Sequence, residues 1–219
     1  MPLRFLYILT IAVLTACGNG ETPGEPVAEE VEEKTIADGT LIIPDSIPPP
    51  ADTPDVFRPD LIISKMKIGH RQSTEAIIGR DIQTVDEGYL PRAGYLNRIR
   101  DQLLTLFFHH GATKNTFHEV RVRFARPEEQ EGADIVQLDV AEFSTGSGIH
   151  LGMTKQEVVT TLGKGYDERF EGSMSILEYK VSDPDKFPVL KSYRMPAYAA
   201  KYIFDEQGLV VMQFGFPYP

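Results

Sequence analysis

The stretch GIHLGMTKQEVVTTLGKG, residues 148–165, carries the clearest signal for the fold. Thr154 is followed three residues later by Glu157, which is the pattern of a capping box, where two side chains bond the free N–H groups of the first helical turn. An apolar edge and a residue suited to end a helix come next: Val158, Val159, Leu162 and Gly163. The stretch therefore predicts a short helix of about nine residues that packs through one edge.

The residues that follow predict antiparallel β-structure. Ser173–Val181 is typical of a strand, and a loop rich in Pro and Asp covers Asp183–Pro188. Tyr198–Phe204 and Leu209–Phe216 predict the two strands of a hairpin, because residues 205–208 form a turn sequence with Gly at its end. The predicted order is one helix followed by three strands.

A related pattern lies earlier in the chain. Residues 67–81, KIGHRQSTEAIIGRD, contain an aliphatic–Gly pair, a polar helix start with Glu75, and a second aliphatic–Gly pair before a basic residue, as residues 148–165 do. Leu103–His109 then predicts a strand and Gly111–Asn115 a turn. We infer two diverged copies of one unit.

The end of the first copy is also predicted to be β-structure. Val120, Val122 and Phe124 alternate with Arg121 and Arg123, which is typical of a half-buried strand. The arginines of this run, Arg121, Arg123 and Arg126, are predicted on its solvent face. A further strand is expected over residues 135–143, and residues 144–148, STGSG, form the joint between the copies. The first unit spans residues 61–145 and the second residues 146–219.

One alternative stays open within the first unit. Leu96, Ile99, Leu103 and Leu106 also fit helical spacing, so residues 97–109 could form a helix that ends near Gly111. The β-rich sequence LTLFF and the parallel with the second copy favour the strand.

The N-terminus predicts an export signal. Residues 5–16 form an apolar run of about a dozen residues, shorter than the roughly 20 that a membrane-spanning helix needs. The Leu14–Cys17 sequence resembles the lipobox of bacterial lipoproteins. That resemblance implies a signal peptide over residues 1–16, cleavage after Ala16 and lipid on Cys17, the single cysteine of the chain. The alternative is an ordinary signal peptide that contains a cysteine, or an uncleaved anchor.

Residues 17–60 predict a disordered, acidic spacer. Between Gly18 and Asp60 there are eleven acidic residues against Lys34 and Arg58, together with half of the prolines of the chain. Residues 61–219 are close to neutral, with 21 acidic and 19 basic residues. This balance disfavours a nucleic-acid partner, which would need a concentrated basic face.

The second unit resembles the small lipoproteins of outer-membrane assembly, the BamE or SmpA type, in its sequence LGMT…EV…LG and in the strands that follow. Two such units in tandem resemble the β-lactamase inhibitor protein. The resemblance implies an α+β fold with short helices packed on antiparallel sheet. Together with Gly18 after Cys17, it also implies a lipoprotein of the outer membrane, facing the periplasm or the exterior, in its assembly or maintenance.

The sequence contains no motif that indicates catalysis. No G-x-S-x-G, H-E-x-x-H or phosphate-loop sequence is present, so we expect no catalytic residue and no cofactor. His109 and His110 end a predicted strand, and His118 on the facing strand could approach one of them, which allows a two-His site at most. We therefore expect no metal. His70 and His150 flank the two glycine motifs and could lie at helix caps.

Aromatic residues of the last hairpin are the candidates for a partner surface. A helix can cover only one face of a three-stranded unit, so aromatic residues on the other face would contact a partner. The candidates are Tyr198, Tyr202, Phe214 and Phe216. The equally weighted alternative is that these side chains complete the core.

The function expected from these features is a non-enzymatic binding or scaffold lipoprotein. It would be held in the lipid bilayer through Cys17 and would bind an envelope protein. The alternative is a small-ligand-binding, hydrolase or inhibitor-type envelope module, with a deep pocket lined by His109, His118 or Asp185.

Overall fold

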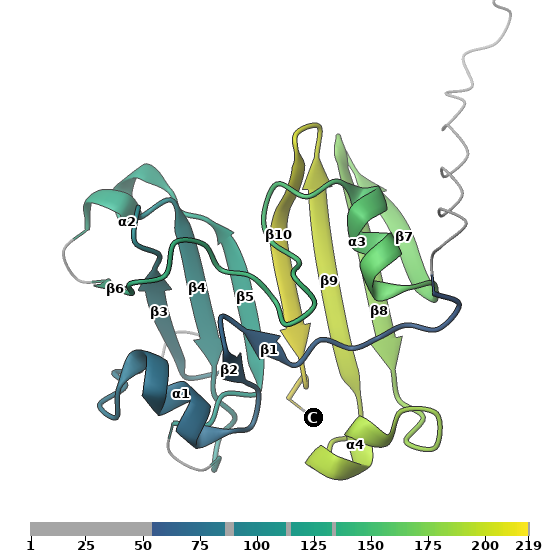
Figure 1. The fold of residues 1–219 in the computed structure, drawn as a ribbon, viewed down its shortest axis with the longest axis horizontal. Helices are drawn as coiled ribbons and strands as arrows, with labels where there is room; N and C mark the ends of the chain where they lie inside the picture. The colour runs from purple at the N-terminus through teal and green to yellow at the C-terminus, as the bar shows by residue number, and fades with distance from the viewer. Residues whose placement is uncertain (1–53, 86–89, 113–114, 133–134, 219) are drawn as a thin grey trace, which may run out of the picture. The chain divides into compact units, whose positions relative to one another are not determined.

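The computed structural model describes residues 54–85, 90–112, 115–132 and 135–218, and these form an α+β fold built on one large sheet (Figure 1). The sheet has eight strands in the order β6-β3-β4-β5-β10-β9-β8-β7. Its neighbouring strands are antiparallel except for β3 and β6. The sequence prediction of short helices on an antiparallel sheet is confirmed at this level.

The elements follow one another in two groups along the chain. The first group is β1 (Ile62–Ile63), β2 (Met66–Lys67), α1 (Arg71–Ile78), β3 (Arg92–Leu96), β4 (Gln102–Phe107), β5 (Glu119–Phe124), α2 (Pro127–Glu131) and β6 (Val136–Gln137). The second group is α3 (Lys155–Leu162), β7 (Tyr166–Glu171), β8 (Met174–Val181), α4 (Pro188–Tyr193), β9 (Tyr198–Asp205) and β10 (Gly208–Gly215). The β1–β2 hairpin forms a small separate sheet.

Helix α3 forms where the sequence predicts it, for the predicted reason. The Thr154 side chain accepts the N–H of Glu157, and the Glu157 carboxylate accepts the N–H of Thr154 at 2.8 Å. Val158 and Leu162 are fully buried. Gly163 ends the helix at a φ of +93°, where a side chain would be strained.

Helix α1 is capped differently. His70 is its N-cap residue and its Nδ1 accepts the N–H of Ser73, so the expectation of a histidine at a helix cap is confirmed there. Glu75 lies two residues further into its helix than Glu157 does in α3, and it forms no capping box. The two glutamates matched in the sequence therefore have different roles.

The two groups of elements meet at strands β5 and β10. Their register pairs Gly215 with Glu119, Gln213 with Arg121 and Val211 with Arg123. Residues of both groups thus lie in one continuous sheet.

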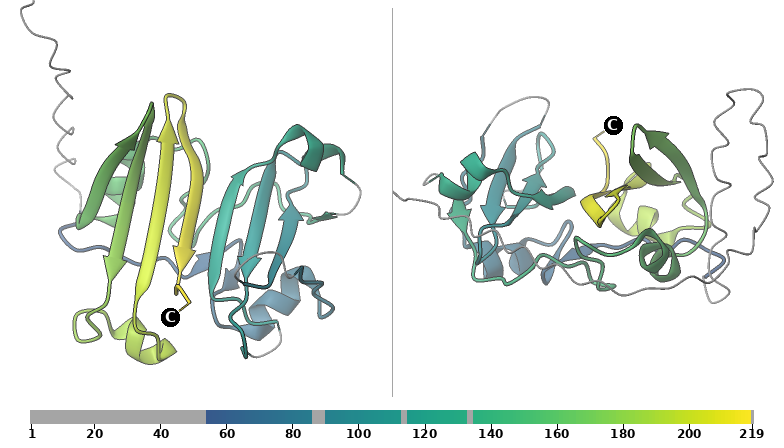
Figure 2. Two further views of the ribbon diagram at one scale, coloured as in Figure 1. Left: turned by 180° about the vertical axis from the view of Figure 1, so that it is seen from behind. Right: turned by 90° about the horizontal axis from the view of Figure 1, so that it is seen from above.

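One face of this sheet is covered and contains the main core. Helices α1 and α3, the β1–β2 hairpin and the chain that links the two groups all lie on this side (Figures 1 and 2). On β9 the burial alternates residue by residue, with each residue that faces this side buried. This is the pattern of an antiparallel sheet with one face in the core.

The folded part begins before the predicted boundary at residue 61. Residues 54–60 run along the covered face from α3 to β1 (Figure 1), and we call them the strap. The Phe57 ring stacks on Tyr179 with ring centroids 4.2 Å apart, and the Arg58 N–H donates to the Leu162 carbonyl at 2.8 Å. The prediction that the spacer extends to residue 60 is wrong for residues 54–60, because their backbone and an aromatic side chain have partners in the core.

Asp60 fastens the end of the strap. Its buried carboxylate accepts the backbone N–H groups of Gly146 and Ser147, each at 3.1 Å, and the Ser147 hydroxyl. Its carbonyl accepts the hydroxyl of buried Tyr198 at 2.7 Å. A charged residue that looked like part of an acidic spacer therefore joins the strap to the chain between the two groups.

Two other expectations are resolved by the strands. Residues 97–109 are not a helix, because β4 pairs with both β3 and β5. The strand expected over residues 135–143 is reduced to β6, whose two residues pair in parallel with β3. Beyond β6, the Asn97 amide donates to the Ala141 carbonyl and the Gln102 side chain accepts the Phe143 N–H, so side chains replace a strand partner.

Candidate functional site

The face opposite the core carries a row of polar side chains. Residues paired across neighbouring strands lie on the same face, and the register connects Gly94, Thr105, Arg121, Gln213, Lys201, Glu178 and Asp167 from β3 to β7. We call this side the open face. Its residues on β9, such as Lys201 and Ile203, are half-buried where those of the covered face are buried.

A hollow of about 450 Å³ lies on the β3–β5 part of the open face. Strand residues such as Gly94, Thr105 and Phe107 line it together with Ile135 and Glu129 of α2. Its charged lining residues are Arg92, Arg121, Arg123, Arg126 and Glu129. We call it the arginine hollow.

Arg121 is held firmly within this hollow. Its Nε–H donates to the Gln213 side chain at 2.7 Å, and its guanidinium carbon lies 5.4 Å from the centroid of the Phe107 ring. Burial is the main cause that lowers the pKa of Arg121, and the charges of Arg123 and Arg92 act in the same direction, while Glu119 opposes them. The lowered pKa of Arg121 therefore reflects its burial, and the largest of the three charge effects on it comes from Glu119.

Arg123 has a carboxylate partner. Its two terminal nitrogens donate to the two oxygens of Glu129 at 2.8 and 2.5 Å, a bidentate pair. This bonding is the main cause that lowers the pKa of Glu129 to about 2. The Glu129 carboxylate also accepts the backbone N–H of Arg126 at 2.8 Å, so it ties the start of α2 to β5.

A second, smaller hollow lies beside the first and is mixed in charge. It measures about 310 Å³ and is lined by Glu119, Gln213, Lys201, Glu178, Lys180, Ala199 and Ala200. The Gln213 amide donates to Glu119, and it joins Glu119 to Arg121 through its other end. The lining of this second hollow thus contains two lysines and two glutamates, whereas the arginine hollow is lined by four arginines and one glutamate.

The predicted aromatic partner surface is wrong. Tyr198, Tyr202, Phe214 and Phe216 are each between 0 and 1% exposed and lie in the main core. The alternation on β9 places the two tyrosines on one face as expected, but that face is the one that helices and connecting chain cover. The alternative, that these side chains complete the core, is what the structure shows.

The histidines of the first hairpin do meet, as predicted. The rings of His109 and His118 stack with centroids 4.2 Å apart and an interplanar angle of 11°, and His109 Nε2 lies 2.9 Å from the Phe216 carbonyl oxygen. Burial, aided by His109, lowers the pKa of His118 to about 4, so its ring is neutral at pH 7. Stacked rings do not direct their nitrogens at one ion. Within the described ranges no three His, Cys, Asp or Glu residues cluster as metal ligands would.

The residues expected to line a deep pocket do not converge. His109 lines a hollow of about 210 Å³ with Phe108 and Asn115. Asp185 lies instead in the turn before α4, where it pairs with Lys191 at 2.6 Å and is 85% exposed. His150, the other histidine expected near a helix cap, faces Glu142 at 3.2 Å and is not the cap of α3.

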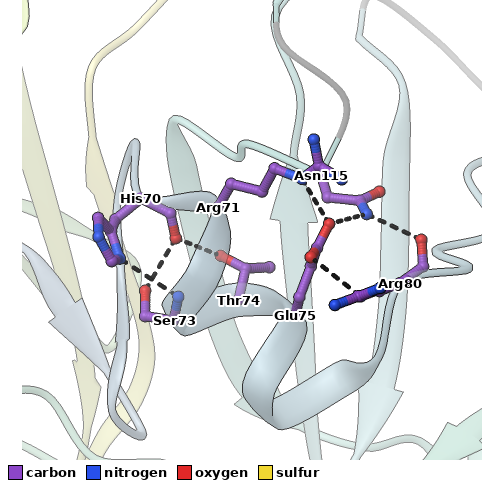
Figure 3. Close-up of polar contacts among 7 residues, drawn as sticks. All are labelled: His70, Arg71, Ser73, Thr74, Glu75, Arg80 and Asn115. Atoms are coloured by element: carbon purple, nitrogen blue, oxygen red, sulfur yellow. Dashed lines mark hydrogen bonds and ion pairs between the residues drawn. The ribbon is translucent and has the colours of Figure 1, made fainter.

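The carboxylate of α1, that of Glu75, has a structural role (Figure 3). Glu75 accepts from Arg71 at 2.5 Å and from the Asn115 amide at 2.8 Å, and Arg80 lies 3.6 Å from its second oxygen. The Asn115 amide also donates to the Arg80 carbonyl. These bonds attach α1 to the turn before β5. The Glu75 carboxylate is therefore engaged by Arg71, Asn115 and Arg80.

Two predicted site residues, Ala16 and Cys17, lie outside the described residues. Within the described part of the chain, every helix is too short or too polar to cross a membrane.

Sequence reasoning grouped Arg121, Arg123 and Arg126 on a solvent face, and all three line the arginine hollow, with Arg126 at the start of α2 rather than within the strand. It did not bring Arg92 beside them, because the proximity of Arg92 depends on the β3–β4–β5 register. Comparison with protein-family models, with curated proteins and with solved structures finds no match for this chain.

Proposed function

We propose that this protein is a non-enzymatic, lipid-anchored module of the bacterial cell envelope that binds another protein through its open face. The row of polar side chains across six strands, from β4 to β7, carries the proposal. It is a broad surface on which Arg121, Gln213 and Glu178 are hydrogen-bonded, and such surfaces suit protein partners better than small ligands. The partner is an envelope protein, and the role lies in outer-membrane assembly or maintenance.

The lipid anchor is proposed on the Leu14–Cys17 sequence and the apolar run before it. One acyl chain gives only marginal membrane binding, whereas two or more give stable anchoring. The acidic residues that follow Cys17 would keep the chain away from anionic lipid surfaces. The folded part would thus stand away from the outer membrane, on its periplasmic or exterior side.

We also propose that the two groups of elements are diverged BamE-like units. The order α1-β3-β4-β5 parallels α3-β8-β9-β10. Both helices have eight residues and end at a glycine with a φ of +85° or +93°. In the second group, strand β7 precedes β8 and pairs with it. At the corresponding place in the first group, a single β-bridge joins Val85 to Arg92 of β3.

The small-ligand or hydrolase alternative has weaker support. Such a function needs polar groups that converge in a pocket. Asp185 instead pairs with Lys191, away from the hollow that His109 lines, and the His118 ring stacks on the His109 ring. We therefore propose protein binding.

Substitution Cys17→Ala tests the anchor. We expect the wild-type chain in the membrane fraction after cell lysis and the variant in the soluble fraction, because the variant cannot carry lipid. Immunoblots of both fractions measure the result, with Thr15→Ser as the control that keeps the cysteine. A Cys17→Ala chain that remains quantitatively membrane-bound would overturn the anchoring claim.

A further inference from the structure

We infer that two copies of this chain associate through β7, whose outer edge pairs with that of the second copy in an antiparallel register centred on Glu168. The pairing joins two eight-stranded sheets edge to edge. This inference goes beyond the proposed function, because it concerns the margin of the sheet, whereas the proposed envelope partner contacts the open face. Either association can form without the other.

Strand β7 is an open edge of the large sheet. All six of its residues pair with β8, and within the described ranges no strand pairs with its other side. Figure 1 shows β7 at the margin of the sheet. The opposite margin is formed by β6, which has only two residues. Because the outer N–H and C=O groups of an edge strand can pair with a further strand, β7 offers the longer template.

The side chains of β7 fit a second copy of β7. A two-fold axis at Glu168 places Tyr166 opposite Phe170 of the second copy, and it places Asp167 opposite Arg169 of the second copy. The symmetry repeats each pair, so the interface contains two aromatic pairs and two pairs of opposite charge. Both kinds of pair stabilise antiparallel strands when the residues lie directly across from each other.

Other symmetric registers fit less well. With the axis at Arg169, this arginine faces its own copy, and Asp167 faces Glu171 of the second copy. With the axis at Asp167, two aspartates face each other. Like charges directly opposite each other are destabilising. With the axis at Phe170, the two strands overlap only through residues 169–171. The sequence YDERFE therefore selects the first register.

Phe170 is an exposed aromatic residue of this edge. It is 51% exposed, and the Lys155 ammonium lies 5.8 Å from the centroid of its ring. Tyr166 lies on the same face of β7, four residues earlier, and is half-buried. Pairing brings each Phe170 ring against Tyr166 of the other copy. Aromatic pairs of this kind contribute more than the apolar area that they bury.

Asp167 gains an opposite charge in the dimer. In the single chain it lies opposite Glu178 of β8, and its side chain forms no ion pair among the described residues. Arg169 contacts its own Glu178 at 3.1 Å and its own Glu171, but its side chain is 48% exposed. A guanidinium has five N–H groups, so Arg169 can also donate to Asp167 of the second copy.

The residue on the axis, Glu168, is already compensated within each copy. Its side chain is 10% exposed, and its carboxylate lies 2.6 Å from the Lys155 ammonium. It also accepts the Ser175 hydroxyl at 2.8 Å. Each glutamate therefore brings its own positive charge to the centre of the interface, which reduces the repulsion between the two carboxylates.

The acidic spacer of the same chain is a less suitable occupant of this edge. Strand β7 carries three carboxylates and one arginine, so it repels an acidic segment such as residues 29–33, EEVEE. A second copy of β7 supplies both signs of charge in the matching order. Since residues 61–219 contain 21 acidic and 19 basic residues, the folded parts of two copies repel each other little.

Sedimentation equilibrium of the full chain in density-matched detergent micelles tests the inference. We expect a reversible monomer–dimer equilibrium for the parental chain. Arg169→Asp and Asp167→Arg should each weaken it about tenfold or more, because two pairs of opposite charge become two pairs of like charge. The double variant restores opposite charges, so its dissociation constant should return to within about threefold of the parental value.

The aromatic pair has its own variant and control. Phe170→Ala should weaken association severalfold, since two aromatic pairs are lost. Phe124→Ala removes another exposed aromatic side chain, 44% exposed and located on β5. It should leave the dissociation constant within about twofold of the parental value. Thermal melting of every variant checks that it is folded.

A thiol crosslink locates the axis. Directly opposed Cα atoms of antiparallel strands lie roughly 4.5–5.5 Å apart, so a short thiol-specific crosslinker should join cysteines at position 168 of two copies. In a Cys17→Ser chain in the same micelles, we expect a crosslinked dimer from Glu168→Cys. We expect none from Gln207→Cys, which lies in the exposed turn between β9 and β10.

Three results would overturn the inference. These are a monomer at every concentration, a double variant that associates no better than the single variants, or crosslinking from position 207 as strong as that from position 168. Association through β7 requires neither lipid nor an envelope protein. Its failure therefore leaves the lipid anchor and protein binding at the open face intact.

Discussion

Gly215→Ala should lower the free energy of unfolding by about 3–5 kcal/mol, because it adds backbone strain and a clash at once. Gly215 has a φ of +143°, which L side chains rarely adopt. A Cβ there would meet the His118 carbonyl oxygen and lie 2.7 Å from the Glu119 Cα, both backbone atoms of β5. Strands β5 and β10 would have to separate where the two groups of elements join.

The matched control is Gly172→Ala. Gly172 also has a positive φ, +62°, but nothing lies within 4 Å of the added Cβ, so we expect a loss of only about 1 kcal/mol. Urea unfolding followed by circular dichroism measures both variants. Equal losses for the two would show that the close approach of β10 to β5 contributes nothing.

Phe57→Ala should also be strongly destabilising, by about 3–5 kcal/mol. The Phe57 ring is 5% exposed, stacks on Tyr179 and lies 6.0 Å from Tyr198. Truncation leaves a cavity between the strap and the covered face, and it removes the contact that holds the strap against β8. The same urea titration measures the loss.

Val56→Ala is the control for the strap. The Val56 side chain is 65% exposed, so its truncation should change the free energy of unfolding by no more than about 0.5 kcal/mol. If residues 54–60 acted only as a spacer, the two variants would be equally mild, and the strap would have no part in the fold.

Local signals predicted the elements whose cause is local. The Thr154–Glu157 pair and Gly163 define α3, and the turn at Gly208 defines the β9–β10 hairpin. Strand β7 was missed because its sequence YDERFE is mostly charged, as suits an exposed edge strand. Helix α4 was missed because Pro188, its first residue, was taken as part of a loop.

Other features depend on contacts between distant residues. The chain after β6 is held by the side chains of Asn97 and Gln102, which are about 40 residues away in sequence. No local pattern reports such bonds, and a strand was therefore expected there. Asp60 similarly bonds residues more than 80 positions later.

In the candidate site, too, local patterns predicted some features and contacts between distant residues decided others. Alternation placed Tyr198 and Tyr202 on one face and Arg121 and Arg123 on one face. The packing of α1, α3 and the connecting chain determines which face of the sheet is covered, and these segments are distant in sequence from β9. For this reason the aromatic surface was wrong, while the arginines stayed solvent-facing and gained Arg92 as a neighbour.

The central claim is that the open face contacts a protein in the envelope. Site-specific photo-crosslinking in intact cells tests it, with the photoreactive residue in place of Lys201 on β9 or, as a control, Gln156 on the exposed side of α3. The account predicts a discrete protein adduct from position 201, weakened by Arg121→Gln, and none from position 156. An adduct from position 156 alone, or none from either, would contradict it.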